Sequence, residues 1–479
     1  MLIYKYFFLV LTCKSAQRQC KSVLSQINFE HVTMKKVSLM IAVAAILFSC
    51  KESTEYVKVI HDASLYSKTV KKLNDIVLEN NFPPMIASRN YAYANIAAYE
   101  VIAAADSRYT SLAGQVRDLT PVPKPAQGKR VDFEFASLLA FCKVGNAVTF
   151  PEGSMDVYVK ELESKAEDEG MPSTVLKDSK EYANTVADAI LAWSKNDNYA
   201  KIRSASKFSV TDEEGRWVPT PPMYAQALEP HWMEIRTLVM DSCSQFRPAP
   251  PPKYEPMNTG SRFYNEMMMV KNLVDSLTPE QKHIADFWDD NAFKLNVVGH
   301  VMYATKKFSP AGHWMNIVGI VAQQQKADFA TTVSAYTQTS IALFESSISC
   351  WDEKYRSNYV RPETVINKHY DGDWKPYIQT PPFPEYTSGH AVISAAAAEV
   401  MTQYFGDNVA YTDSSELEFG IPNRSFTSVR EAAKEAAISR VYGGIHYKNS
   451  CDVGNQEGIK IGQLVLQKIK MKDLPVAKN

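Results

Sequence analysis

Seven residues in the carboxy-terminal third of the sequence have the types that an oxyanion-binding site needs. A multiply charged oxyanion is bound by cations in fixed geometry together with hydroxyl and backbone N–H donors. Arginine can bind two oxygens of one anion, lysine supplies a compact charge, and imidazole can act as nucleophile, ligand or proton carrier near neutral pH. We therefore expect one pocket for a tetrahedral oxyanion. The residues are Lys354, Arg361, Ser388, Gly389, His390, Arg440 and His446.

The segments around these residues predict helices whose ends hold the site. Arg361 precedes a proline, which disfavours the helical conformation, so a long helix must end before it and Arg361 must lie on extended chain. Ser388 and Gly389 open an Ala-rich segment, which places them at a helix amino terminus, where free N–H groups and the dipole favour anions. Arg440 falls in the last turn of a helix that opens with a capping-box sequence. The glycine pair after that helix lets the chain bring His446 back toward Arg440.

The rest of the chain predicts an all-α fold. Most long segments after residue 50, such as residues 91–105, have apolar residues at helical spacing, and few segments alternate as strands do. A Pro-rich stretch over residues 247–256 cannot be helix interior. We expect it to separate an amino-terminal helical region, residues 50–250, from a carboxy-terminal helical catalytic region, residues 257–470, with its core at 345–468.

The composition excludes several classes of function. With 479 residues, 45% hydrophobic and 22% charged residues and a net charge of -1, the chain is typical of a globular protein large enough for an enzyme. No basic tract indicates nucleic acid as a partner, and the oligomeric state is not predictable. HExxH and CxxC patterns are missing, so a zinc site is not expected. Four scattered cysteines could pair in an oxidising compartment, without assignable partners: Cys142, Cys243, Cys350 and Cys451.

The amino terminus is typical of an exported lipoprotein. Met34 begins the run MKKVSLMIAVAAILFSC, in which two lysines precede an apolar stretch of signal-peptide length. The run ends at Cys50 in a sequence that resembles a bacterial lipobox, whose cysteine is lipidated and becomes the first mature residue. We therefore interpret residues 1–33 as a mis-assigned start and 34–49 as the signal peptide, with the mature chain lipid-anchored to a bacterial membrane, on its periplasmic side or on the outer-membrane surface. A buried helix and a transmembrane anchor are the alternatives.

The spacing of the seven residues resembles a known signature. Lys354 is followed by six residues and an Arg-Pro pair, the second block is Thr387-Ser388-Gly389-His390, and the third is Ser-Arg, five residues and His446. This resembles the K-x6-RP, PSGH and SR-x5-H-x3-D signature that the vanadium-dependent haloperoxidases share with the type 2 phosphatidic acid phosphatases (the PAP2 superfamily). The resemblance covers roughly residues 327–468. It implies a fold of helical bundles that hold the anion between helices.

The resemblance also implies a role for each residue of the signature. The lysine and the two arginines would bind the equatorial oxygens of the oxyanion, and the serine and glycine would donate hydrogen bonds. His446 would be the apical ligand of vanadium, or the nucleophile that becomes phosphohistidine. His390 would be the acid-base partner on the opposite face. The cofactor would be vanadate in a haloperoxidase, whereas a phosphatase would need none.

Three further residues have uncertain roles. The position four after His446 is Ser450, where the signature has an acid that orients the histidine. Asp452 could replace that acid if the loop is rearranged, or it could be a solvated turn residue. Trp351 and Phe383 lie where haloperoxidases of the chloroperoxidase type carry aromatic residues beside the cofactor, although aromatic residues in such segments are more often part of the core.

We predict a vanadate-dependent haloperoxidase that oxidises a halide with hydrogen peroxide. The two aromatic residues favour this activity, and so does the long segment of about 300 residues before the first motif, which simpler phosphatases of the superfamily lack. A periplasmic phosphomonoesterase with a phosphohistidine intermediate is the first alternative. A non-catalytic surface lipoprotein that retains the pocket is the second.

Overall fold

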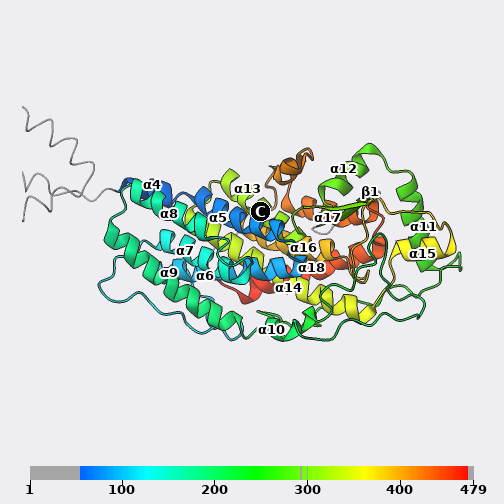
Figure 1. Cartoon of the computed structure of the whole chain (residues 1–479), viewed down its shortest axis with the longest axis horizontal. Coiled ribbons are helices and arrows are strands. Elements are labelled where there is room, and N and C mark those ends of the chain that lie inside the picture. Colours follow the sequence, from blue (N-terminus) through cyan, green and yellow to red (C-terminus); the bar gives the residue numbers. More distant parts are fainter. Residues whose placement is uncertain (1–53, 292–293, 299, 473–479) are drawn as a thin grey trace, which may run out of the picture. The chain divides into compact units, whose positions relative to one another are not determined.

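The computed structural model describes residues 54–472 except 292–293 and 299 (Figure 1). The predicted all-α class is confirmed, because the described residues form helices with only two short antiparallel two-stranded sheets. Cys50, the predicted signal peptide and the segment before it lie outside the described residues. Within the described part of the chain, no helix is both long and apolar enough to cross a membrane.

The helices before the Pro-rich stretch surround a largely buried helix, α6. This helix contacts α7, α9, α13 and α14 and is buried on all sides from Met85 to Ile102, as expected for a helix with apolar residues around its whole circumference. The elements of this part are α4 (Glu55–Ile60), α5 (Ala63–Glu79), α6 (Pro84–Ala105), α7 (Phe133–Val148), α8 (Asp156–Asp168), α9 (Ser173–Ser194), α10 (Tyr199–Ile202) and the 3-10 helix η2 (Trp232–Glu234).

The helices that hold the candidate site follow the Pro-rich stretch. In this part α14, α16 and α18 pack side by side, and α17 lies against α16 and α18 (Figure 1). The elements are α11 (Arg262–Asp275), α12 (Pro279–Phe287), β1 (Lys294–Val298), β2 (Val301–Thr305), α13 (Pro310–Gln324), α14 (Phe329–Ser357), α15 (Pro362–His369), α16 (Gly389–Phe405), β3 (Tyr411–Asp413), the 3-10 helix η3 (Ser415–Phe419), β4 (Arg424–Phe426), α17 (Val429–Tyr442) and α18 (Lys448–Lys468).

Small residues set the distance between α16 and α18. Gly454, Gly458 and Gly462 recur every fourth residue on the face of α18 that meets α16. A Cβ at Gly458 would overlap the carbonyl oxygen of Val392, and one at Gly462 would lie 2.8 Å from the carbonyl oxygen of Ala396. The two backbones therefore approach more closely than any larger residue on α18 would allow. This contact fixes the helix whose amino terminus belongs to the site.

The composition of the Pro-rich stretch over residues 247–256 predicted a boundary between two helical regions. The structure does not divide the described chain into two packed units there. Residues from 54 onward form one compact unit, and α6 packs directly against α14 across the predicted boundary. The stretch is extended and is attached to the second part by tyrosine hydroxyls. Tyr359 donates to the carbonyl oxygen of Pro252 at 2.6 Å, and Tyr386 donates to that of Ala249 at 2.7 Å. Proline prevented a helix here but did not prevent packing.

The four cysteines of the described residues are free thiols, so the pairing considered from the sequence does not occur in this structure.

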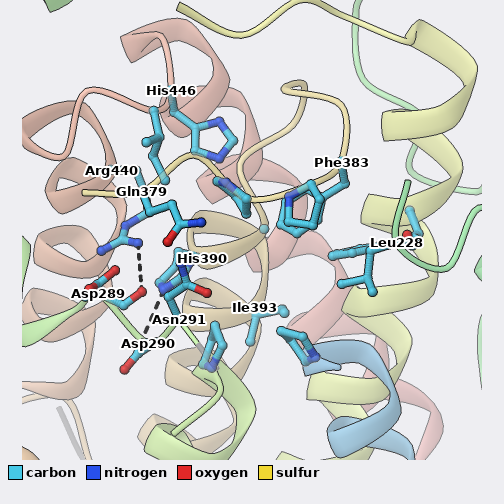
Figure 2. Close-up of a pocket in the computed structure, with 17 residues that line it drawn as sticks. Leu228, Asp289, Asp290, Asn291, Gln379, Phe383, His390, Ile393, Arg440 and His446 are labelled. Carbon is cyan, nitrogen blue, oxygen red and sulfur yellow. Dashed lines mark hydrogen bonds and ion pairs between the residues drawn. The ribbon is translucent and has the colours of Figure 1, made fainter. Parts of the chain in front are cut away.

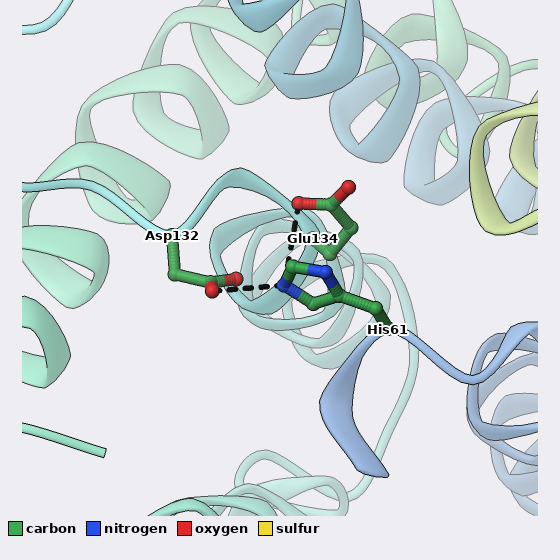
Figure 3. Close-up of side chains that lie close together, drawn as sticks. All are labelled: His61, Asp132 and Glu134. Carbon is green, nitrogen blue, oxygen red and sulfur yellow. Dashed lines mark hydrogen bonds and ion pairs between the residues drawn. The ribbon is translucent and has the colours of Figure 1, made fainter. Parts of the chain in front are cut away.

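A separate polar cluster joins the start of α5 to the start of α7 (Figure 3). Asp132 caps α7 by accepting the Phe135 N–H at 2.9 Å, and its other oxygen lies 2.9 Å from His61 Nε2. Burial lowers the pKa of His61, but Asp132 and Glu134 outweigh this effect and raise it. The cluster therefore acts as a helix cap and an ion pair.

Candidate active site

Lys354 is held at the carboxy-terminal end of α14 by backbone carbonyl groups. The helix ends at Ser357, before the proline, as predicted. The Lys354 ammonium is buried and donates to the carbonyl oxygens of Pro384 at 3.0 Å, Glu385 at 3.0 Å and Thr387 at 2.6 Å. Burial lowers the pKa of Lys354 to about 8. The lysine thus fixes the loop before α16 while keeping its charge inside the protein.

Arg361 lies on extended chain at the start of α15, as predicted, with φ -77° and ψ 150°. Its guanidinium is fully buried and donates to the carbonyl oxygens of Phe383 at 3.0 Å and Ile445 at 2.8 Å. Its Nη2 atom has no hydrogen-bond partner among the described residues. Burial lowers the pKa of Arg361 to about 10, which keeps the side chain charged near neutral pH. One donor of this arginine therefore remains available.

Arg440 lies in the last turn of α17, as predicted. It donates to the carbonyl oxygens of Trp288 and Asp289, the latter at 3.2 Å, and thereby attaches α17 to the chain after α12. Neither Arg440 nor the other two buried cations forms an ion pair with a carboxylate of the described residues; their acceptors are mainly carbonyl oxygens. Three buried positive charges without direct counter-ions favour binding of an anion.

Ser388 and Gly389 begin α16, as predicted. Ser388 is the N-cap residue, and its buried hydroxyl has no hydrogen-bond partner among the residues that the structure describes. A Cβ at Gly389 would meet only Trp351, Cys350 and Lys354, at 3.8–4.0 Å, so the protein packing alone would accept alanine there. Gly389 instead lines the cavity, where its lack of a side chain leaves the backbone open. The start of α16 thus presents free donors to the cavity.

His446 is buried between a carboxylate and an arginine. Its Nδ1 lies 2.7 Å from Glu385 Oε1 and its Nε2 lies 3.1 Å from Arg361 Nη1. Burial lowers the pKa of His446 well below its ordinary value, and the charges of Arg361 and Lys354 lower it further. The imidazole is therefore neutral, with the Nδ1 proton donated to Glu385 and the Nε2 lone pair directed to the cation-rich side. Glu385 fixes this tautomer.

Of the two alternatives for Asp452, the structure shows the solvated residue and not the orienting acid. The Asp452 carboxylate is exposed and pairs with Lys448 at 2.5 Å. The reason is helical geometry, because α18 already begins at Lys448 and two residues along a helix turn a side chain by about 200°. Asp452 therefore cannot take the direction of Ser450. Sequence reasoning missed Glu385, although it is the only acid in the Pro-rich turn FPEYTSGH before α16.

Glu385 is a buried acid at the back of the site. It also accepts the Tyr447 backbone N–H at 3.1 Å. Burial raises the pKa of Glu385 to about 7, while the charges of Arg361 and Lys354 oppose the rise. The carboxyl group therefore changes charge near neutral pH.

His390 lies in the first turn of α16 and lines the cavity. Its Nε2 is 3.4 Å from Asp290 Oδ2, the contact drawn in Figure 2, and neither atom has a closer hydrogen-bond partner among the described residues. Burial lowers the pKa of His390 to about 4, and the nearby charge of Arg440 contributes, whereas Asp290 opposes. His390 is thus neutral near pH 7 and can accept a proton. Asp290 was missed from the sequence, although the adjacent acids in ADFWDDN were a signal.

The two histidines, Arg440 and Gly389 line a cavity of about 620 Å³, part of it open to solvent. Arg440, His390 and His446 lie on one side of it, and Phe383 and Leu228 lie on the opposite side (Figure 2). The Phe383 ring packs on Trp351 with centroids 5.1 Å apart, and Lys354 Nζ is 5.0 Å from the Phe383 centroid. The structure therefore places both predicted aromatic residues beside the cations. Of the seven predicted residues, Gly389, His390, Arg440 and His446 line the cavity, whereas Lys354, Arg361 and Ser388 are buried next to it without lining it. The other wall of the cavity is apolar.

Comparisons with known proteins identify the family and the fold. A family model described as the VCPO second helical-bundle domain matches residues 334–472. The crystal structure of a bacterial vanadium-dependent iodoperoxidase is 44% identical in sequence, with a TM-score of 0.80, and the match covers 85% of this chain and 96% of that one. A bacterial vanadium-dependent chloroperoxidase is 17% identical in its holo form, with a TM-score of 0.62 over 81% of this chain and 92% of that one, and shows the same fold. Its apo form gives 17% identity, a TM-score of 0.61 and coverage of 81% and 94%. The curated proteins gave no match.

Proposed function

This chain belongs to the vanadium-dependent haloperoxidases, and from that premise we propose that it holds vanadate at His446 and oxidises iodide with hydrogen peroxide. The predicted haloperoxidase function, preferred over the phosphohistidine phosphatase and the non-catalytic lipoprotein, is confirmed by the 44% identity to the bacterial iodoperoxidase over most of both chains. The same similarity confirms vanadate as the cofactor of this family member. The choice of iodide and the role of each residue are proposals.

The observation that carries the site assignment is the set of buried cations without carboxylate partners. Vanadate is an anion, and it would neutralise Lys354, Arg361 and Arg440 where the described protein groups do not. Two buried donors that lack protein partners, Arg361 Nη2 and the Ser388 hydroxyl, would then acquire acceptors. The donor set thus fits a tetrahedral oxyanion, because each unsatisfied group gains a hydrogen bond.

Each residue has a separate proposed task. The three cations would bind oxygens of the vanadate, and Ser388 with the Gly389 N–H would donate hydrogen bonds to it. His446 would supply its neutral Nε2 as the ligand, since Glu385 holds the proton on Nδ1. Bound vanadate supplies a Lewis acid that activates hydrogen peroxide for attack by a halide.

His390 is the proposed proton carrier of the reaction. In the balanced reaction, a halide ion, hydrogen peroxide and a proton give hypohalous acid and water. His390 is neutral near pH 7, because burial lowers its pKa to about 4, and one ring nitrogen can accept a proton from the entering peroxide. The resulting imidazolium is stabilised by Asp290 and can return the proton to the departing oxygen. His390 thereby moves a proton from one peroxide oxygen to the other, and the net proton that the reaction consumes comes from the solvent.

Iodide is proposed as the preferred halide because the 44% identical relative is an iodoperoxidase. The test uses protein that begins at Cys50, prepared without vanadate and then titrated with orthovanadate. We expect peroxide-dependent formation of triiodide only after vanadate is added, with kcat/KM for iodide above that for bromide and no chlorination. Chlorination, or a higher kcat/KM for bromide, would contradict iodide preference. Hydrolysis of p-nitrophenyl phosphate serves as the phosphatase control.

The site assignment has its own mutational test. Replacing His446 with alanine removes the proposed vanadate ligand, so we expect loss of vanadate binding and of iodide oxidation. Asp452→Ala is the matched control, because the Asp452 side chain is exposed and pairs with Lys448. Full activity of His446→Ala would refute the assignment.

We also propose that the mature protein is a lipoprotein anchored at Cys50. The support is the sequence of residues 34–50, with two lysines, an apolar run and a terminal cysteine. A bacterial host that expresses the full sequence should attach labelled fatty acid to the protein and retain it in the membrane fraction. Cys50→Ala should abolish the label, and labelling that persists in this variant would contradict the proposal.

A further inference from the structure

A buried histidine that the proposed chemistry does not use lies behind His390. His313, in α13, is fully buried, and each of its ring nitrogens faces a carboxylate. Its Nδ1 is 2.9 Å from Asp290 Oδ1, and its Nε2 is 3.0 Å from Asp413 Oδ2. The ring also stacks on the Trp288 indole, with centroids 4.6 Å apart and planes 25° apart. Contacts along both ring edges and one face therefore fix its position.

The geometry indicates that His313 is an imidazolium. An ionised carboxylate only accepts hydrogen bonds, so two carboxylate partners require a proton on each ring nitrogen. Burial lowers the pKa of His313, but Asp290 and Asp413 outweigh it and hold the pKa well above its ordinary value. Asp413 is itself fixed, since its second oxygen accepts the backbone N–H and the hydroxyl of Ser415 at 2.9 and 2.6 Å. His313 and Asp413 thus form a rigid ion pair.

The other charged groups around His313 do not disturb this arrangement. Glu416, in η3, has an oxygen 3.9 Å from His313 Nδ1, and burial raises its pKa to about 8, so it is a neutral acid near pH 7. Lys307, before α13, donates to the carbonyl oxygen of Asp286 at 2.8 Å. Asp289 lies 3.3 Å from Lys294 Nζ and 3.9 Å from Lys307 Nζ. The charge of His313 is therefore balanced mainly by Asp290 and Asp413.

Asp290 connects His313 to the site. Its Oδ1 binds His313, and its Oδ2 is the atom 3.4 Å from His390 Nε2. The Asp290 backbone has φ 42°, in the left-handed region that aspartate and asparagine tolerate better than most residues. Such a backbone conformation persists only where the surrounding structure holds it. Of the two histidines that face the Asp290 carboxylate, only His313 lies within normal hydrogen-bond distance.

We propose that His313, braced by Asp413, is a positioning residue that keeps Asp290 ionised and aimed at His390. The inference rests on the proposed role of His390 as the proton carrier. Without the imidazolium, the buried Asp290 carboxylate would lose its charge-assisted hydrogen bond and take up a proton or turn away. His390 would then lose the partner that stabilises its protonated form during halide oxidation.

A matched pair of variants separates positioning from packing. Asparagine places an amide nitrogen near the Nδ1 position of histidine, and glutamine places one near Nε2. His313→Asn can therefore still donate to Asp290, whereas His313→Gln can donate only to Asp413. Both variants lose the charge and the stacking on Trp288, so their melting temperatures should fall by similar amounts.

The kinetic result expected is a fall in kcat that depends on which donor remains. His313→Gln should lower kcat for iodide oxidation about tenfold or more, as loss of a supporting partner commonly does. KM for iodide and the vanadate Kd should stay within roughly twofold of the wild-type values, because Lys354, Arg361 and Arg440 are unchanged. His313→Asn keeps a neutral donor to Asp290 but lacks the charge, so its kcat should lie between those of His313→Gln and the wild type. Equal kcat in the two variants would overturn the positioning role and leave His313 a packing residue.

A spectroscopic measurement tests the imidazolium independently of catalysis. Vanadate-free wild-type protein should show two exchange-protected imidazole N–H proton resonances far downfield, and both should be missing from His313→Gln. Their absence from the wild type overturns the proposal. If the proposed function fails instead, the wild type lacks vanadate-dependent iodide oxidation while these resonances remain. One bound divalent cation per wild-type chain, lost in His313→Gln, would also overturn the proposal, because ligand atoms of Asp290, His313 and Glu416 lie within 4.8 Å of one another.

Discussion

Replacing Glu385 with glutamine should weaken vanadate binding by an amount that depends on pH. The carboxylate accepts the His446 Nδ1 proton at 2.7 Å in a fully buried pair. A hydrogen bond to a charged group contributes about 1.5–3 kcal/mol, and loss of such a partner typically weakens metal binding about 10- to 100-fold. Glutamine keeps an oxygen that can accept this proton but lacks the charge. We therefore expect the vanadate Kd of Glu385→Gln to rise about tenfold at pH 8.5, the lower end of that range.

The effect should disappear as the pH falls, because burial raises the pKa of Glu385 to about 7. Above pH 7 the wild type carries the negative charge that glutamine lacks, so the two proteins differ. Below pH 7 the wild-type acid becomes neutral and resembles the amide, so the two Kd values should converge near pH 5.5. The assay is isothermal titration of vanadate-free protein with orthovanadate at both pH values.

The control for this experiment is Asp452→Asn, which removes the acid that was one of two alternatives offered by the sequence for the same task. Its carboxylate is 55% exposed and pairs with Lys448, so its loss should change the vanadate Kd by less than about twofold. The reasoning would be refuted if Asp452→Asn raised the vanadate Kd as much as Glu385→Gln does. It would also be refuted if Glu385→Gln bound vanadate with wild-type affinity at pH 8.5.

Three further outcomes follow from other parts of the structure. Ser388→Ala removes a buried hydroxyl that lacks a partner among the described residues, so urea unfolding of the vanadate-free protein should be unchanged while the vanadate Kd rises about tenfold. Gly458→Ala places a Cβ onto the carbonyl oxygen of Val392 and should lower the free energy of unfolding by about 1–3 kcal/mol; an unchanged value contradicts the close helix contact. Burial lowers the pKa of His390 from 6.5 to about 4, so between these values the unfolded chain binds more protons and stability falls as the pH falls. The free energy of unfolding should fall by roughly 3 kcal/mol by pH 4. Urea unfolding measured as a function of pH should show this decrease in the wild type and not in His390→Gln.

Local rules predicted the parts of the site that depend on helix ends. Arg361 is extended because a proline follows it, and Ser388 caps α16, which ends at Gly406 with φ 94°. Each of these features is decided by neighbours within a few residues. The capping box of α17 was only half correct, since Ser428 accepts the Glu431 N–H at 3.1 Å but the Glu431 carboxylate binds Thr427 instead.

Contacts between distant segments could not be predicted in this way. Glu385 meets His446 across 61 residues, and Asp290 meets the ring of His390 across 100 residues, so neither pairing leaves a periodic pattern in the sequence. The signature pointed to an acid after His446, but the helical phase of α18 turns Asp452 outward. The fold was easier to predict because helix formation repeats one local rule over many residues.

The carbonyl acceptors of the three buried cations have a consequence for when the cofactor can be acquired. Lys354 and Arg361 bind the carbonyl groups of the loop before α16, Arg361 also binds that of Ile445, and Arg440 binds those after α12. These segments are far apart along the chain, from Asp289 to His446. A nascent chain therefore has no partial site with useful affinity. We expect vanadate to enter only the finished protein, so that the supply of cofactor limits how much enzyme becomes active and not how much folds.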